Sequence, residues 1–302
     1  MNTTKNTLDT KEASLIKWPL LRSFIYLVCF FITLIAVRIF FIAIASILTK
    51  EDPLMIQEKL DSTSEPIWLM FFYLTATIGI LSITWFFRTY IDRKSFKSLG
   101  FEWQGEQKKD AIVAFFLGLA LIVVGFILFL GLGLVSITAI TFAPKILLTY
   151  VVILICVSLV EEVSIRGYVL KNLLEATDKY VALVITASCF GLLHIANPNV
   201  NMLSMLNIFL AGILLGLYYI YRQNLWFPIA LHFSWNFFQG PVFGFEVSGI
   251  ELNSLITQKI SGSTWLTGGD FGLEGSALLS VLLLFAIFFV EYKYGKKRID
   301  LT

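Results

Sequence analysis

Charged residues are scarce in this chain. Asp, Glu, Lys and Arg make up 15% of the 302 residues, and hydrophobic residues make up 57%, whereas a soluble domain is nearer a quarter charged. The apolar residues fall in blocks of about 20, the length that crosses a hydrocarbon core of roughly 30 Å. The composition therefore excludes an ordinary soluble protein and predicts an all-α polytopic membrane protein.

Cysteine is also scarce, and its placement excludes a disulfide framework. The chain has three cysteines, Cys29, Cys156 and Cys189, which lie in apolar runs and are odd in number. We expect them to act as small buried hydrophobes. A cleaved signal peptide is not predicted either. The first apolar run, Leu20 to Leu48, is too long for one and lacks a small-residue cleavage site, so we expect it to remain as an anchor.

Apolar runs long enough to be helices recur along the whole chain. We interpret them as about eight transmembrane helices in one bundle, although the fifth and seventh are short. They are residues 20–48, 67–87, 111–136, 146–170, 180–195, 202–221, 225–238 and 276–290.

The placement of charge predicts the orientation of the bundle. Lys and Arg gather at residues 88–109 and again after residue 290, whereas segments 49–66 and 239–275 carry a net negative charge. Under the positive-inside rule, both termini are then cytoplasmic and both acidic segments lie outside. The segment 239–275 shows no helical or strand pattern, which is typical of a functional lid or a disordered loop.

Nothing in the sequence indicates a second domain. Within one membrane domain we distinguish four parts. They are a cytoplasmic N-terminal tail (1–19), N-terminal transmembrane helices (20–136), a core that carries the motifs below (146–249), and a C-terminal part with the outer loop, the last helix and a basic cytoplasmic tail (250–302).

Several glycines and one arginine lie inside the apolar runs. Two of the apolar runs carry glycines that permit close helix contacts. These are Gly118, Gly125, Gly131 and Gly133 in the third run, and the G-x-x-x-G pair Gly212 and Gly216 in the sixth. Arg38 lies inside the first run and either extends to the membrane surface or pairs with a buried acid. Its position about three turns from the end of the run favours the first.

Two adjacent carboxylates and a guanidinium interrupt the fourth apolar run, as Glu161-Glu162-Val-Ser-Ile-Arg166. Ionisable residues at membrane depth are costly and mark functional sites. Glu162 and Arg166 are four residues apart on one helical face and are expected to form an ion pair. Glu161 points about 100° away from Glu162 and has no local cation, so we expect it to be the free carboxylate that acts as a general base.

Both histidines of the chain lie in runs near this motif. His194 ends the fifth run in Phe190-Gly-Leu-Leu-His194, and His232 begins His232-Phe-Ser-Trp-Asn236 in the seventh. At 1.5 Å per residue, both imidazoles and Glu161 lie well inside the bilayer. A carboxylate, two imidazoles and an amide at similar depth can activate water, stabilise an oxyanion or bind a metal.

Each of these residues also has an interpretation without catalysis. A single intramembrane histidine more often forms a hydrogen bond between helices than acts as a catalyst. Asn236 alone would also join helices through a hydrogen bond. The acidic pair alone could serve as a proton relay in a transporter. The absence of inverted repeats and of broken helix pairs counts against a transporter, and the concentration of these groups in nearby runs favours a catalytic site.

The three motifs together resemble the CPBP family, the CAAX-protease and bacteriocin-processing intramembrane proteases, including type II CAAX prenyl endopeptidases. The family signatures E-E-x-x-x-R, F-x-x-x-H and H-x-x-x-N stand in this chain in that order, within a resemblance that covers residues 146–249. The resemblance implies a bundle of about eight helices that cleaves peptide bonds within or beside the membrane.

The resemblance also assigns roles to residues. It implies that Glu161 activates the hydrolytic water together with His194. His232 and Asn236 would form the oxyanion hole. The residues Glu162, Arg166 and Phe190 would support the site.

The family has often been described as metalloproteases, which leaves two routes open. The chain has no H-E-x-x-H motif, but Glu161, His194 and His232 could bind zinc with an open position. We favour a metal-free mechanism without a cofactor, because His232 and Asn236 read naturally as paired hydrogen-bond donors.

The expected partners are membrane lipid and a hydrophobic or lipidated peptide or protein substrate, and no nucleic acid. The expected location is a cell membrane, and the closeness to bacterial members favours a bacterial plasma membrane and a peptide precursor or membrane protein as substrate. The alternative from another class is a non-catalytic membrane protein that confers immunity or scaffolds a partner.

Overall fold

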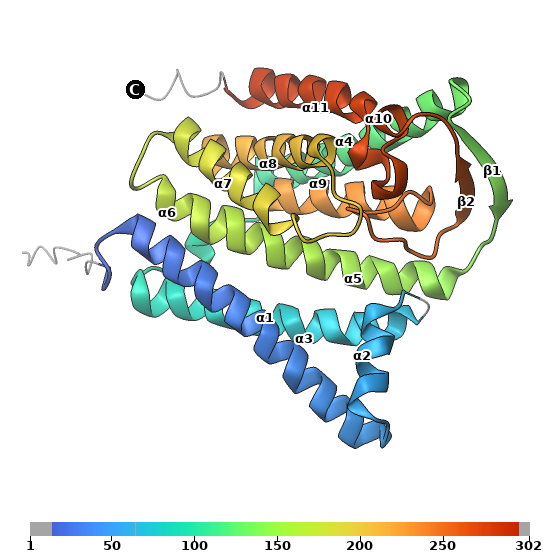
Figure 1. Ribbon diagram of the computed structural model, residues 1–302. Helices are drawn as coiled ribbons and strands as arrows, with labels where there is room; N and C mark the ends of the chain where they lie inside the picture. Colours follow the sequence, from blue (N-terminus) through green and yellow to red (C-terminus); the bar gives the residue numbers. More distant parts are fainter. Residues whose placement is uncertain (1–13, 64, 296–302) are drawn as a thin grey trace, which may run out of the picture.

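The structure is a computed structural model that describes residues 14–63 and 65–295, and it is mostly helical (Figure 1). Within these residues, six helical segments are long and apolar enough to cross a membrane. They are Pro19–Thr49 (α1), Pro66–Ile91 (α3 and η1), Gly105–Gly131 (α4), Pro144–Leu173 (α5, η3 and α6), Met202–Arg222 (α8) and Ala277–Gly295 (α11 and η7).

The two remaining apolar runs are helical but short. Helix α7 (Lys179–Leu193) has 15 residues and α9 (Trp226–Phe237) has 12. At about 1.5 Å per residue, neither alone spans a hydrocarbon core of roughly 30 Å. The prediction of a helical membrane bundle is therefore confirmed. The predicted count of eight transmembrane helices is supported for six.

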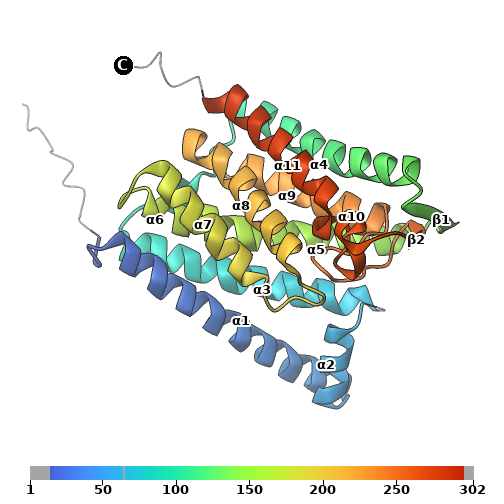
Figure 2. The same cartoon turned by 45° about the horizontal axis from the view of Figure 1, so that its top comes forward.

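The bundle has two distinct ends. Helix α1 begins and α11 ends at the same end, whereas α2 (Pro53–Asp61) and the strands lie at the opposite end (Figures 1 and 2). The basic tail residues Lys5 and Lys11 and the residues after 295 lie outside the described residues, and the cytoplasmic orientation stays a prediction.

The acidic segments contain more regular structure than the sequence indicated. Segment 49–66 forms helix α2, which starts where the Asp52 carboxylate accepts a hydrogen bond from Leu54 N at 2.7 Å and Pro53 takes the first helical position. The prediction of a segment 239–275 without helix or strand is wrong. It contains β2 (Ile256–Ile260), which pairs antiparallel with β1 (Val135–Ile140), and β1 overlaps the last two residues of the predicted third run.

Short helical turns connect the longer elements, and none was expected from the apolar periodicity. They are the π-helical turns η1 (Phe87–Ile91), η3 (Val163–Leu170), η4 (Phe238–Val242) and η7 (Glu291–Gly295), the 3₁₀ turns η2 (Phe96–Leu99), η5 (Gly269–Phe271) and η6 (Leu273–Gly275), and the helices α6 (Lys171–Leu173) and α10 (Thr264–Thr267).

Glycines set the closest helix contacts in the bundle. Helix α4 packs along α9, and a Cβ at Gly118 would stand 2.8 Å from the Leu231 carbonyl oxygen. Helix α8 packs on α7, and a Cβ at Gly212 would stand 3.0 Å from Ala187 Cα. The predicted role in close packing is confirmed for these glycines. It is wrong for Gly131 and Gly133, where a Cβ would meet nothing within 4 Å.

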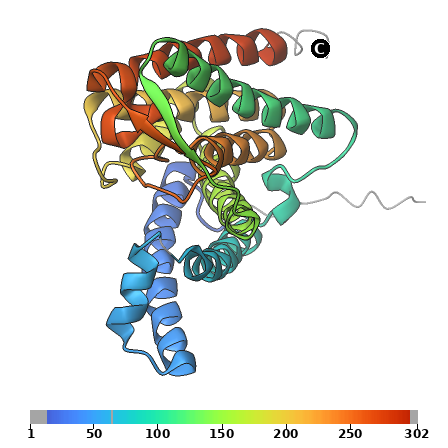
Figure 3. The ribbon, with the colours of Figure 1, turned by 90° about the vertical axis from the view of Figure 1, so that its right-hand side faces the viewer.

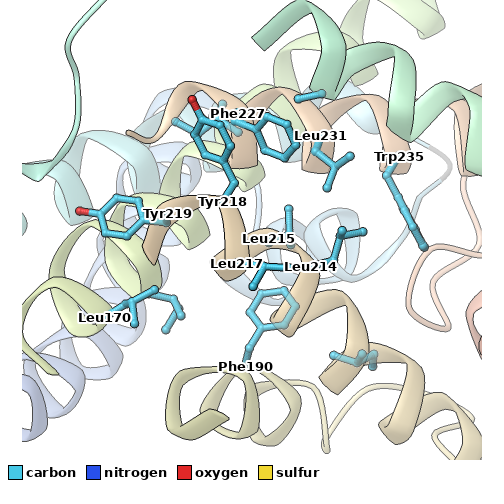
Figure 4. Close-up of a cluster of buried hydrophobic side chains, with 14 of the residues drawn as sticks. Leu170, Phe190, Leu214, Leu215, Leu217, Tyr218, Tyr219, Phe227, Leu231 and Trp235 are labelled. Atoms are coloured by element: carbon cyan, nitrogen blue, oxygen red, sulfur yellow. The ribbon is translucent and has the colours of Figure 1, made fainter. Parts of the chain in front are cut away.

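The apolar core surrounds α8 and the inner face of α9. Leu214 and Leu215 of α8 lie between Phe190 of α7 and Leu231 of α9, and Trp235 lies farther along α9 (Figure 4). Each of these side chains is less than a tenth exposed. They form an apolar layer next to the polar residues of the motifs, several of which lie on the same helices.

Helix α1 stands apart from this core for most of its length (Figure 3). In the most apolar 18-residue stretch of α1, 6% of the residues are buried, whereas 61% are buried in the corresponding stretch of α8. The first turn of α1 is fixed by ion pairs. The buried Arg22 contacts Asp92 at 3.1 Å, and Arg88 contacts the same carboxylate at 2.9 Å. Tyr168 of η3 also donates to Asp92 at 3.1 Å. This buried network gave no signal in the sequence, where Arg22 was one basic residue among several.

Candidate active site

A cavity of about 1040 Å³ lies between α1, α3, α5, α8 and α9. It extends to the end of the bundle that carries α2, where the last turn of α2 and the segment Val247–Leu252 complete its wall. Its lining is mostly apolar, and all the residues predicted to be catalytic line it. They are Glu161, His194, His232 and Asn236. The fold thus brings together groups from α5, α9 and the end of α7.

Glu162 and Arg166 form the predicted ion pair beside this cavity. The Nη1 atom of Arg166 is 2.9 Å from Glu162 Oε1, and both side chains are at most 1% exposed. The π-helical turn η3 starts directly after Glu162 and holds the pair within one widened turn. Arg166 also donates to the Gly212 carbonyl at 3.2 Å and lies 4.3 Å from the centre of the Phe190 ring. The guanidinium therefore links α5, α7 and α8.

His232 lies between the two glutamates. Its Nδ1 is 2.8 Å from Glu162 Oε1, and because a carboxylate only accepts, the contact places a proton on Nδ1. Its Nε2 is 3.9 Å from Glu161 Oε2, too far for a direct hydrogen bond. The imidazole is oriented by one carboxylate and presents its other nitrogen to the second, while Phe190 packs edge-on against it.

Glu161 is the carboxylate without a partner. Its Oε2 atom is buried and accepts no hydrogen bond within the described chain, although 27% of the side chain is exposed. A buried polar atom without a partner is uncommon and marks a place for a water or a ligand. The gap of 3.9 Å to His232 Nε2 leaves this oxygen available to a third group.

His194 is held by the end of its own helix. Helix α7 ends at Leu193 before the sequence Ala-Asn-Pro, and His194 is its C-terminal cap. Its Nδ1 lies 2.7 Å from the Phe190 carbonyl oxygen, one of the acceptors that a helix end leaves free. Since a carbonyl only accepts, Nδ1 carries the proton, and Nε2 of the neutral ring has a lone pair.

Asn236 follows His232 by one helical turn on α9. Its side chain is 7% exposed and lines the cavity, and its amide makes no hydrogen bond with another described residue. The amide group can therefore donate into the cavity. An imidazole and an amide on one helical face are suited to binding a single oxygen atom.

The predicted zinc ligands are Glu161, His194 and His232, and a catalytic zinc site needs three protein ligands around one ion. Within residues 14–63 and 65–295, no three His, Cys, Asp or Glu side chains form a group that could hold one metal ion. Glu161, His194 and His232 line one cavity but do not form a three-ligand set in this arrangement. The absence of a cofactor requirement stays a prediction.

Sequence reasoning missed a buried carboxylate at the cavity, that of Glu274. Its Oε2 accepts from Ser248 N at 2.6 Å and from Ser248 Oγ at 2.9 Å, and its Oε1 accepts from Trp235 Nε1 at 3.0 Å. Asn207 holds the backbone of the same turn, donating to the Glu274 carbonyl at 2.8 Å. These bonds fix the outer segment on α9 beside Asn236. In the sequence, Glu274 was one acid in an acidic loop, and no pattern indicated its role.

Residues 143–238 match the family model of Rce1-like, type II CAAX prenyl endopeptidases. The matched range starts at the entry to α5 and ends directly after α9, so it holds every residue predicted to act at the site. The family resemblance seen in the motifs is confirmed. The match supports a peptidase in a multi-pass membrane protein. No curated protein and no solved structure matches the chain.

Proposed function

From the similarity of its core to type II CAAX prenyl endopeptidases, we propose that the chain is an intramembrane endopeptidase. Its substrates are hydrophobic or lipidated peptides that associate with the membrane. The observation that carries the proposal is the unpartnered Glu161 Oε2, which faces His232 Nε2 across 3.9 Å in an apolar cavity. A carboxylate in such surroundings is suited to accept a proton from water.

In the proposed reaction, water is bound between Glu161 and the free Nε2 of His194. Glu161 takes a proton from the water as its oxygen attacks the carbonyl carbon of the scissile peptide bond. The proton then passes to the nitrogen of the leaving amine, which departs as the C–N bond breaks. Glu161 ends the cycle as a carboxylate, so no net proton is consumed by the enzyme.

The oxyanion of the tetrahedral intermediate is assigned to Asn236 and His232. The Asn236 amide donates one hydrogen bond, and His232 Nε2 donates the other. Because Glu162 already accepts the Nδ1 proton of His232, donation from Nε2 requires the imidazolium form of His232. Arg166 and Glu162 act by holding this imidazole in place.

The cavity also suggests the side from which substrate enters. Its wall includes Asp61 of α2 and the segment Val247–Leu252, at the end opposite to the start of α1. With the predicted cytoplasmic termini, substrate would reach Glu161 from the extracytoplasmic half of the membrane.

The deciding experiment compares wild type with Glu161→Gln in lipid nanodiscs, with a pool of hydrophobic and lipidated peptides and a chelator present. Mass spectrometry detects new peptide termini. We expect wild type to produce them and Glu161→Gln to lose on the order of 10²- to 10⁴-fold in rate. Glu58→Gln, on the exposed face of α2, is the matched control and should cleave as wild type does.

Other outcomes are equally informative. Cleavage that requires added zinc and stops with chelator would replace the metal-free mechanism with a metal-dependent one. Equal cleavage by wild type and Glu161→Gln would remove Glu161 from the reaction. If a biological role of the protein survives both Glu161→Gln and His194→Ala, the non-catalytic immunity or scaffold role is correct.

A further inference from the structure

Arg38 differs from every other residue of the cavity wall. Among the described residues that line the cavity, it is the one Lys or Arg, whereas acids are contributed by Asp61, Glu161, Glu251 and Glu274. It lies in the middle of the apolar helix α1, where a charge is costly unless it has a role. In the structure its guanidinium donates a hydrogen bond to Asp61 at the end of α2, and both residues line the cavity.

That partner is held weakly. Arg38 Nη2 is 2.7 Å from Asp61 Oδ1, and the two side chains are 37% and 57% exposed. Both side chains line the cavity, so the pair is accessible to a group that enters it, unlike the buried pair of Glu162 and Arg166. Asp61 is the last residue of α2. A second carboxylate that enters the cavity can therefore take its place at little cost.

Arg38 and Glu161 line the same cavity, and Tyr73 of α3 lines it with them. An extended peptide advances about 3.3–3.6 Å per residue. A peptide whose scissile bond lies at Glu161 can thus extend along the cavity toward Arg38, which lines the same wall.

We propose that Arg38 is a substrate-binding residue that receives a carboxylate of the peptide close to the scissile bond, in exchange for Asp61. The proposal rests on the proposed peptidase function and names a substrate class, which is an apolar peptide that carries a free C-terminal carboxylate or an acidic side chain. A guanidinium suits this role because its planar fork binds a carboxylate through two parallel hydrogen bonds. The apolar wall, with Phe72 and Leu69 of α3, accommodates the hydrophobic residues.

The test uses one cleavable apolar peptide in three forms. The first has a free C-terminal carboxylate, the second a C-terminal carboxamide, and the third a carboxamide with a glutamate near the C-terminus. Wild type, Arg38→Gln, Asp61→Asn and Lys59→Gln are compared in nanodiscs. Lys59 of α2 is a matched control, because it forms an ion pair of 2.7 Å with Glu51, which precedes that helix, and does not line the cavity.

We expect Arg38→Gln to raise KM for the free-acid peptide about tenfold to a hundredfold, with kcat unchanged, and to leave the carboxamide unaffected. Asp61→Asn should lower KM for the free-acid peptide, because Arg38 no longer has a competing partner. Lys59→Gln should match wild type. If the glutamate peptide restores the preference, the subsite takes side-chain carboxylates. If it does not, the subsite takes the C-terminus.

Two results would overturn the proposal. Wild type with the same KM for all three peptides would show that no carboxylate is bound. A shift in the same direction by Arg38→Gln and Asp61→Asn, equal for acid and carboxamide, would show that the ion pair only supports the fold. The same comparison of Kd values in a Glu161→Gln background needs no turnover, so it decides the subsite even where the peptidase proposal fails.

Discussion

The ion pair of Glu162 with Arg166 and that of Arg38 with Asp61 differ chiefly in burial. Glu162 and Arg166 of the core are at most 1% exposed, whereas Arg38 and Asp61 at the mouth of the cavity are 37% and 57% exposed. Their distances are similar, 2.9 and 2.7 Å. The buried pair cannot separate without leaving a charge in an apolar interior. The exposed pair can exchange partners at little cost, so the first is suited to fix geometry and the second to bind.

The same contrast holds for the helices that carry the pairs. The most apolar window of the segment with α5 is 50% buried, and that of α1 is 6% buried. The core derives its order from packing on every side. Helix α1 packs on α3 and α2, and its first turn is also fixed by the ion pair of Arg22 with Asp92.

The largest effect is expected when one partner of the buried pair is removed. Glu162→Ala leaves Arg166 unpaired in the core and removes the acceptor of His232 Nδ1. We expect it to cost about 3–5 kcal/mol of stability and to lower kcat on the order of 10²-fold. Thermal unfolding in detergent and the cleavage assay measure the two effects.

Two further variants complete this experiment. Glu162→Gln keeps an oxygen for His232 and should retain more activity than Glu162→Ala. Arg38→Gln, in the exposed pair, should change stability by less than about 1 kcal/mol. A loss of stability at Arg38 as large as that at Glu162 would contradict the contrast between the pairs.

A smaller effect is expected at the carboxylate that fixes the outer segment. Glu274→Ala leaves the buried Trp235 indole N–H and the Ser248 backbone N–H without their acceptor. We expect a loss of about 2–3 kcal/mol and a higher KM, because Ser248 forms part of the cavity wall. Glu251→Ala removes an exposed acid from the same wall and should leave stability unchanged. Equal unfolding temperatures for the two variants would disprove the role of Glu274.

The smallest expected effect concerns helix packing in the core. Gly118→Ala places a methyl group against Ser234 Oγ and 2.8 Å from the Leu231 carbonyl oxygen of α9, and it should cost about 1–3 kcal/mol. Gly131→Ala, at the end of the same helix, meets nothing within 4 Å and should be neutral or slightly stabilising. Unfolding curves of the two variants test the difference. If Gly131→Ala is the more damaging, the contact of α4 with α9 is not what requires Gly118.

Local patterns predicted much of the site because they concern single helices. The four-residue spacing of Glu162 and Arg166 gave their ion pair, and the same spacing put His232 and Asn236 on one face. Apolar runs gave the helices, and the short fifth and seventh runs correspond to the short helices α7 and α9. The sequence could not show that His232 contacts Glu162, since that bond joins residues 70 positions apart.

What the sequence by itself determined was therefore the helical membrane class, the buried ion pair and the set of polar residues at membrane depth. Each follows from composition or from the 3.6-residue period of one helix. Only the tertiary structure decided which groups share the cavity, that Glu274 fixes the outer segment, and that Arg38 faces Asp61. These pairings join segments far apart in the chain, and their partners are selected by how the helices pack and how deeply each charge is buried.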